Sequence, residues 1–275
     1  MTPRTEVQQL YRYTYSAPIT DVHQRLVMVP PDVHRDQRLI HYSFAVRGAD
    51  PGWELEWCID QFGNRVCRAR VPSVQHVLEL EAQYVVEHAI SPASSAPASF
   101  ARDVFLQPTA LTAPDGRLSE VATDIGSTAK TPEECAERAH DWAARAIAYQ
   151  VGATGVRTPA AMALHLGRGV CQDYAHVLLC LLRLLGIPAR YVSGQLPGDG
   201  VAHAWVEALI GDTIIAYDPT HHRRTSCQYV SVAVGRDYAD VTPTSGTFTG
   251  AATGVLSATK CARAVCDKLA AEDAA

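Results

Sequence analysis

The chain has 275 residues, of which 47% are hydrophobic and 19% are charged, and its formal net charge is −5. This length predicts one large domain or two modest ones. The acidic balance excludes the broad basic surface typical of proteins that bind nucleic acids or anionic membranes. The first ten residues lack the apolar core of a signal peptide, and the most apolar window, 177–187, is too short to span a bilayer. We therefore expect a cytoplasmic protein.

The first 90 residues have the residue pattern of β-strands. Turn residues separate six candidate strands, at 10–15, 25–29, 39–46, 53–59, 65–71 and 74–86. Short strands at this spacing favour an antiparallel β-sandwich over alternating βαβ units. A stretch of small residues and prolines follows at 91–99, which is typical of a linker. We therefore predict an N-terminal β domain at 1–90 and a linker at 91–118.

The second half of the chain carries helix signals. Thr131-Pro-Glu-Glu134 combines a cap, a proline at the first helical position and acidic residues in the first turn. A second helix is predicted to start at Thr158, and a third, apolar one runs from about Val170 to Leu185, closed by Gly186. We assign a catalytic domain to 119–245. The remaining residues, 246–275, are expected to form a C-terminal tail that is partly disordered.

A hairpin is predicted around Gly211-Asp212, between strands at 204–210 and 213–217. In a two-residue hairpin with this centre, Trp205 faces Asp218, and His203 becomes the diagonal neighbour of Asp218 on the same face. Backbones of diagonal neighbours lie roughly 7–8 Å apart, a distance that long side chains close. A slip of one residue would place His203 and Asp218 on opposite faces.

A thiol at a predicted helix start is followed by an imidazole and a carboxylate on two paired strands, an arrangement that suits nucleophilic thiol catalysis. Cys171 begins the third helix, whose N-terminal N–H groups and dipole stabilise a thiolate. His203 is the candidate base that accepts the thiol proton, and Asp218 would orient the imidazole. His176 is a rival base, but it lies about 140° around the helix from Cys171 and points elsewhere.

Three further residues are candidates for contacts with the substrate. The backbone N–H of Cys171 is a natural oxyanion donor, and Tyr149 or Gln172 would supply the second donor. The sequence does not choose between these two. Trp205 and the loop at 194–201 are expected near the mouth of a cleft between the Cys171 helix and the His203 strand.

At these residues the chain resembles the transglutaminase-like superfamily of papain-like thiol enzymes. The resemblance rests on four ordered segments, Gly169-Val-Cys-Gln-Asp-Tyr-Ala-His176, Leu182–Gly194, His203-Ala-Trp-Val-Glu207 and Tyr217-Asp-Pro-Thr220. Two other segments, 60–64 and 235–241, are similar to the bacterial branch that has an N-terminal β domain. The resemblance implies an α+β fold, in which a catalytic helix packs on an antiparallel sheet. It also implies Cys171 as nucleophile, His203 as base and Asp218 as orienting carboxylate.

The expected activity is amide acyl transfer through a thioester on Cys171, with a peptide or protein amide as substrate. Water would resolve the thioester in a peptidase or deamidase, and an amine would resolve it in a transamidase. The alternative function is a catalytically silent binding or scaffolding module on the same fold. The sequence indicates no cofactor. It also implies no metal, because it lacks the acidic loop that calcium-dependent members of the superfamily carry. The only macromolecular partner expected besides the substrate is a second copy of the chain, through an exposed edge strand.

Overall fold

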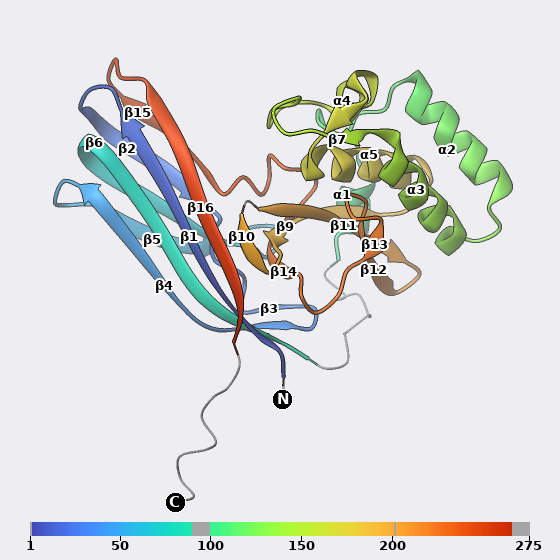
Figure 1. Ribbon diagram of the computed structural model, residues 1–275, viewed down its shortest axis with the longest axis horizontal. Coiled ribbons are helices and arrows are strands. Elements are labelled where there is room, and N and C mark those ends of the chain that lie inside the picture. Colours follow the sequence, from blue (N-terminus) through green and yellow to red (C-terminus); the bar gives the residue numbers. More distant parts are fainter. Residues whose placement is uncertain (1, 90–99, 201, 266–275) are drawn as a thin grey trace, which may run out of the picture.

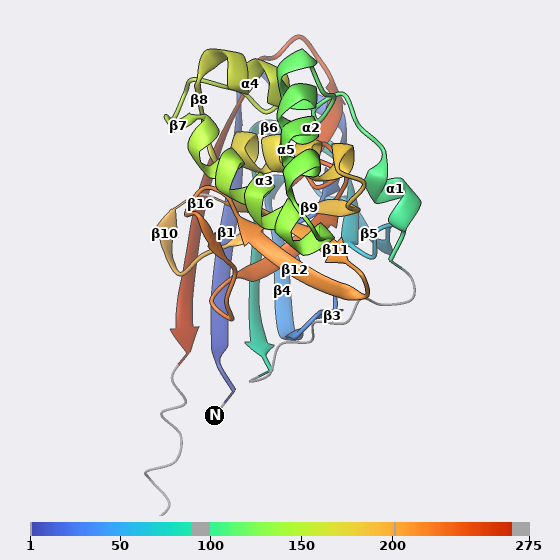
Figure 2. The same ribbon diagram turned by 90° about the vertical axis from the view of Figure 1, so that its right-hand side faces the viewer.

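Two antiparallel sheets, one short parallel pair of strands and a group of helices form the described part of the chain, which comprises residues 2–89, 100–200 and 202–265 of a computed structural model. Long strands of a nine-stranded sheet lie on one side of the molecule and helices lie on the other (Figure 1). A five-stranded sheet lies between them, and in the view turned by 90° the helices and this sheet lie in front of the long strands (Figure 2). The expected α+β architecture with an N-terminal antiparallel sheet is confirmed.

The nine-stranded sheet is organised around one long strand, β6. Its members are β1 (Arg4–Tyr15), β2 (Ile19–Leu26), β3 (Val33–His34), β4 (Gln37–Ala49), β5 (Glu54–Ile59), β6 (Arg65–His88), β10 (Gly198–Gly200), β15 (Thr244–Thr249) and β16 (Gly254–Val265). Strand β6 pairs with β5 and β2 in its first part, and with β4 and β1 after Val74. The change occurs beside Pro72, which cannot donate a ladder hydrogen bond. The two strands predicted at 65–71 and 74–86 are therefore one.

The C-terminal segment belongs to this sheet, so the predicted tail at 246–275 is wrong for its first twenty residues. Strand β16 pairs with β1 along its whole length, from Arg4↔Val265 to Tyr15↔Gly254, and β15 pairs with β2. Most side chains of β16 are exposed and small, so the segment lacks an apolar pattern. Its position is fixed instead by backbone hydrogen bonds to the edge of β1. Residues 266–275 lie outside the described residues.

Five helices precede or flank the five-stranded sheet: α1 (Arg102–Leu106), α2 (Gly116–Thr128), α3 (Pro132–Ala146), α4 (Ala160–Leu166) and α5 (Cys171–Leu184). The caps match the sequence signals. The hydroxyl of Thr131 accepts a hydrogen bond from the Glu134 amide at 3.1 Å, and Gly186 follows α5 with a φ of 73°. No helix among the described residues is long and apolar enough to cross a membrane.

The predicted linker at 91–118 contains structure in its second half. Helix α1 and the start of α2 fall in this range, whereas residues 90–99 lie outside the described residues. Phe100 and Phe105 are buried against Leu209 and Ile214 of the hairpin, and the Phe105 carbonyl accepts a hydrogen bond from the buried Arg183. Residues 100–118 are therefore part of the helical region, because aromatic burial fixes them there.

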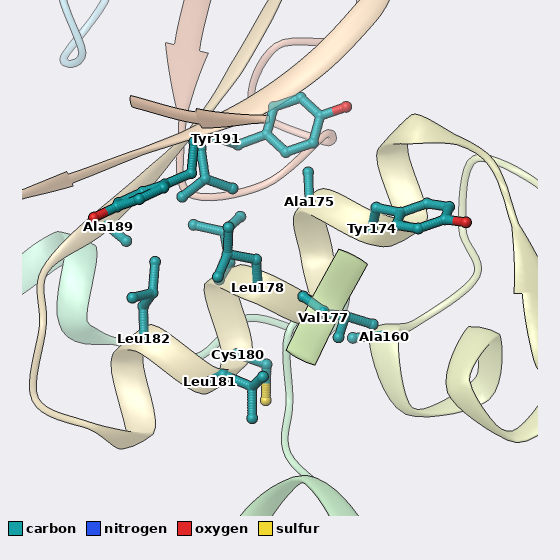
Figure 3. Packing of buried hydrophobic residues seen from close by; sticks show 14 of the residues in the cluster. Ala160, Tyr174, Ala175, Val177, Leu178, Cys180, Leu181, Leu182, Ala189 and Tyr191 are labelled. Atoms are coloured by element: carbon teal, nitrogen blue, oxygen red, sulfur yellow. The ribbon is translucent and has the colours of Figure 1, made fainter. Parts of the chain in front are cut away.

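Helix α5 packs on the five-stranded sheet, whose strands are β9 (Ala189–Gln195), β11 (His203–Ile210), β12 (Thr213–Asp218), β13 (Arg223–Arg224) and β14 (Val230–Gly235). Leu178 and Leu182 of the helix share one buried cluster with Ala189 and Tyr191 of β9 (Figure 3). This packing places the first turn of α5 beside the start of β11.

The two sheets are joined by a shared core and by buried polar contacts. Val7 and Tyr84 of the nine-stranded sheet are buried together with Val230 and Val232 of β14. Strand β10, which follows β9 in the chain, extends the nine-stranded sheet by pairing with β16. The segment that connects β9 to β11 is thereby attached to the N-terminal domain.

Candidate active site

The first turn of α5 holds Cys171 in a fixed position. The Asp173 carboxylate accepts hydrogen bonds from the Val170 amide at 2.7 Å and from the Thr154 hydroxyl at 2.6 Å. A Cβ atom on Gly169 would lie 2.6 Å from the same carboxylate, so only glycine fits before Val170. Cys171 follows as the first helical residue, a position at which backbone N–H groups have no partner within the helix.

The β11–β12 hairpin has the predicted register. Val206 pairs with Tyr217, and Ile210 pairs with Thr213 across the Gly211-Asp212 turn. His203 and Asp218 consequently share one face, and His203 Nε2 lies 2.8 Å from Asp218 Oδ2. The other ring nitrogen, Nδ1, is therefore the one that remains for proton exchange with a thiol.

Asp218 is fully buried and accepts hydrogen bonds on both carboxylate oxygens. Besides His203, its Oδ2 contacts the Tyr229 hydroxyl at 2.6 Å and His221 Nδ1 at 2.7 Å. Its Oδ1 accepts from the backbone amides of Thr220 at 3.0 Å and His221 at 3.2 Å. Burial by itself would raise the pKa of Asp218, but these donors and the charge of His203 hold the pKa well below its usual value. The carboxylate therefore stays ionised.

Tyr229 and His221 were not predicted from the sequence as hydrogen-bond partners of Asp218. Tyr229 comes from the loop before β14, and no motif marks it as a partner of Asp218. His221 lies in the loop after β12, and its ring centroid lies 4.9 Å from that of His203. Their contacts arise because the chain turns back over Asp218 after β12.

A cavity of about 250 Å³ contains both Cys171 and His203. Its other described lining residues are Tyr149, Gln195, Leu196, Pro197, Gly198, Gly200, Ala202 and Lys260. The Cys171 sulfur lies 3.9 Å from the Ala202 carbonyl oxygen, at the point where β11 begins. The structure thus brings the predicted nucleophile and base together under the segment that links β9 to β11.

The Cys171 thiol is neutral in this environment unless a base removes its proton. Burial raises the pKa of Cys171 to about 11, and the carboxylates of Asp218 and Asp173 act in the same direction. The amides of Ala204 and Gln172 oppose this effect by hydrogen bonding to the sulfur. Because burial dominates, the thiolate needs the imidazole of His203 as a proton acceptor.

Of the three candidate substrate contacts, one lines the cavity. Tyr149 is half exposed there, and it is held beside the start of α5 by the parallel pair of β7 (Ala148–Tyr149) and β8 (Arg168–Gly169). Gln172 is buried instead, and its side-chain amide donates to the Val156 carbonyl at 3.3 Å. Of the two candidate donors, Tyr149 is therefore the one placed at the cavity.

The expectation that Trp205 lies at the mouth of the cleft is wrong. The side chain is 1% exposed and packs edge to face against Tyr229, with ring centroids 5.2 Å apart. A Cβ atom on Gly194 would lie 2.3 Å from the indole ring, so the indole fills the space that this glycine leaves. The Trp205 ring stacks beside the His203 ring, with ring centroids 6.2 Å apart.

His176, the rival base, is not among the described residues that line the cavity. His176 is fully buried and its Nε2 accepts a hydrogen bond from the Tyr238 amide at 3.2 Å, which turns it away from Cys171. Within the described ranges, two groups of side chains offer ligand atoms within 4.8 Å of one another, His203–Asp218–His221 and His140–Asp141–His222. In the first group, His203 and His221 are each hydrogen-bonded to the Asp218 carboxylate.

Both parts of the chain match families of known proteins. The family model described as Transglutaminase-like superfamily matches residues 119–219, and that of the Bacterial transglutaminase-like N-terminal region matches residues 5–87. An uncharacterized protein of Mycobacterium leprae is 42% identical over 158 residues, which are 54% of this chain and 56% of that protein. The chain thus spans about half the length of that relative.

Other similarities extend over more of the chain. An uncharacterized protein of Mycobacterium tuberculosis is 26% identical over 89% of this chain and 87% of its own length. A crystal structure named "Putative Cysteine Protease from Cytophaga hutchinsonii" has the same fold, with a TM-score of 0.78, 21% identity, and coverage of 98% of this chain and 93% of that one. From its matched core and its matched β domain, the chain belongs to the transglutaminase-like superfamily and carries the N-terminal region of its bacterial members.

Proposed function

We propose that the protein is a cysteine-dependent amide acyl-transfer enzyme that acts on a peptide or protein. The observation that carries this proposal is the shared cavity of Cys171 and His203, together with the 2.8 Å contact of His203 to the ionised Asp218. A thiol at a helix start, an imidazole and an orienting carboxylate are the groups that nucleophilic acyl transfer uses.

In the first half-reaction, the Cys171 sulfur attacks the amide carbonyl carbon while its proton moves to His203 Nδ1. The carbonyl becomes an oxyanion, which the backbone N–H of Cys171 and the Tyr149 hydroxyl would stabilise. The imidazolium then protonates the leaving amine as the C–N bond breaks, and the acyl group remains on Cys171 as a thioester. Asp218 stabilises the imidazolium, because its pKa is held low and it stays charged throughout.

In the second half-reaction, water or a primary amine attacks the thioester and transfers a proton to His203. The bond between sulfur and carbon breaks, and Cys171 recovers its proton from the imidazolium. Water yields a carboxylic acid, and an amine yields a new amide. A cavity of about 250 Å³ is small for a ligand site and suits one extended side chain or a short peptide segment. No disulfide involves Cys58, Cys67, Cys135, Cys171, Cys180 or Cys227 in the described part of the chain, which supports action in a reducing compartment such as the cytoplasm.

The test uses a defined mixture of glutamine-containing peptides, incubated with the protein in the presence and absence of a primary amine. Mass spectrometry distinguishes new termini, deamidated glutamine and amine adducts. Each product should disappear in Cys171→Ala, whereas Cys227→Ser, which changes an exposed thiol outside the cavity, should keep the activity. Full turnover by Cys171→Ala would refute the proposal. Absence of every product, with a Cys171 thiol that is no more reactive than Cys227, would favour the silent binding module.

A further inference from the structure

Lys260 brings a side chain of the N-terminal sheet into the active-site cavity. It lies on β16, opposite Gln9 of β1 and opposite Gly200 of β10, and it lines the same cavity as Cys171 and His203. The residue is far from the catalytic segments in sequence, and only the pairing of β16 in the sheet places it there. The N-terminal domain therefore contributes directly to the surface that a substrate meets.

The Lys260 ammonium is desolvated and has no carboxylate partner among the side chains that the structure describes. The residue is 6% exposed, and its Nζ lies 5.1 Å from the centre of the Tyr11 ring, a cation–π contact. Burial lowers the pKa of Lys260 to about 8, so the side chain is still mainly charged at neutral pH. Among the described residues, no carboxylate forms an ion pair with it, although a buried charge is costly without one.

Other buried cations of this protein have their partners within the fold. Arg190 forms a salt bridge with the buried Glu207 at 2.7 Å, and Arg183 donates to the oxygens of Phe105, Thr112 and Ala189. Lys260 differs from both, because its ammonium lies over the face of an aromatic ring, the group that opposes the effect of burial on its pKa is Cys171, and its cavity is open to a ligand. The described residues that line this cavity include no aspartate or glutamate.

We propose that Lys260 binds a carboxylate group of the substrate and thereby positions the scissile amide at Cys171. This proposal rests on the proposed function, and it specifies the substrate class as amides that carry a nearby free carboxylate. A charge-assisted hydrogen bond between ammonium and carboxylate would supply the missing counter-ion of Lys260. The carboxylate comes either from the C-terminus of a short peptide or from an acidic side chain.

The first experiment compares two alkylating reagents that differ in charge. Iodoacetate carries a carboxylate and iodoacetamide does not, so the ratio of their rates at Cys171 measures carboxylate recognition without a known substrate. The same ratio at the exposed Cys227, read from the same peptide digest, corrects for the intrinsic difference between the reagents. We expect the corrected ratio at Cys171 to be about tenfold, as one charge-assisted hydrogen bond would give.

Two variants test the origin of this preference. Lys260→Met keeps the length of the side chain and removes the charge, so the corrected ratio should fall to about one. Lys260→Arg keeps the charge and should retain a ratio above one. A Lys260→Met variant with an undiminished ratio would overturn the proposal. If Lys260 instead only stabilised the thiolate, both reagents would slow equally in Lys260→Met and the ratio would not change, which also overturns it.

A second measurement uses the wild-type protein alone. Alanyl-alanine, alanyl-alanine amide, N-acetylglutamate amide and N-acetylglutamine amide are compared as protectants of Cys171 against iodoacetamide. Protection only by alanyl-alanine identifies a C-terminal carboxylate, and protection only by the glutamate compound identifies an acidic side chain. Equal protection by the neutral and charged members of each pair contradicts the proposal.

The outcome for Lys260 is separable from that for the proposed function. If Cys171 is not activated, its reaction with iodoacetamide will be insensitive to His203→Ala, whatever happens at Lys260. If Cys171 is activated but Lys260 does not bind carboxylates, the response to His203→Ala persists, and the corrected reagent ratio in the wild type is one.

Discussion

Replacement of His203 by alanine should make the Cys171 thiol less reactive than an ordinary exposed cysteine. Without the imidazole, the thiol retains a pKa of about 11, which is set mainly by burial. At pH 7.5 a thiol with that pKa is only ~3 × 10⁻⁴ ionised, whereas an exposed thiol of ordinary pKa is roughly 0.1 ionised. The thiolate population therefore differs by about 300-fold.

Part of this difference is offset, because a thiolate of higher pKa is a stronger nucleophile. With a Brønsted coefficient of about 0.4–0.5, a pKa difference of about 2.5 returns roughly tenfold in rate. We therefore expect Cys171 in His203→Ala to react with iodoacetamide about 30-fold more slowly than Cys227 in the same molecule. In the wild type, base catalysis by His203 should raise the rate at Cys171 by about 10² or more over the variant.

The assay is the pH dependence of alkylation at each cysteine, followed by peptide mass spectrometry. In His203→Ala the rate at Cys171 should rise tenfold per pH unit up to at least about pH 10, because the thiol pKa is raised. The shape of this profile does not depend on steric access, which affects only its amplitude. A plateau at Cys171 near about pH 8.5, the ordinary thiol pKa, would refute the argument that burial controls the thiol.

Other substitutions test the supports of the site. Tyr229→Phe removes one donor from the Asp218 carboxylate and should slow Cys171 alkylation about fivefold, measured at constant pH. Glu207→Gln leaves the buried Arg190 without its partner and should lower the free energy of unfolding by about 3 kcal/mol in urea titrations. Although burial alone would raise it, the pKa of Glu207 is held well below its usual value by its cationic neighbours, so this stabilisation is complete above about pH 4.5. The wild-type advantage should therefore shrink as the pH falls below that value. Gly169→Ala would force a Cβ atom against the carboxylate that caps α5, so iodoacetamide labelling at Cys171 should fall markedly while circular dichroism stays unchanged.

Local sequence signals were sufficient for the elements that carry the site. The helix that starts at Cys171 was predictable from its apolar run and from the glycine that ends it, because caps act over a few residues. The hairpin register, and with it the contact of His203 to Asp218, followed from the two-residue turn at Gly211-Asp212 and the alternation of side chains.

The sequence by itself therefore determined the family, the order of its domains, and the helix and hairpin that carry Cys171, His203 and Asp218. Only the tertiary structure decided which distant residues surround them. Trp205 is buried because its ring fills the space over Gly194, and Lys260 reaches the cavity because β16 pairs with β1. The position of Lys260 depends on the pairing of β1 with β16, which are more than 200 residues apart in the chain. The position of Trp205 depends on the pairing of β11 with β9. Local sequence patterns do not predict such long-range contacts, because the conformational propensities of each segment are compatible with many tertiary arrangements.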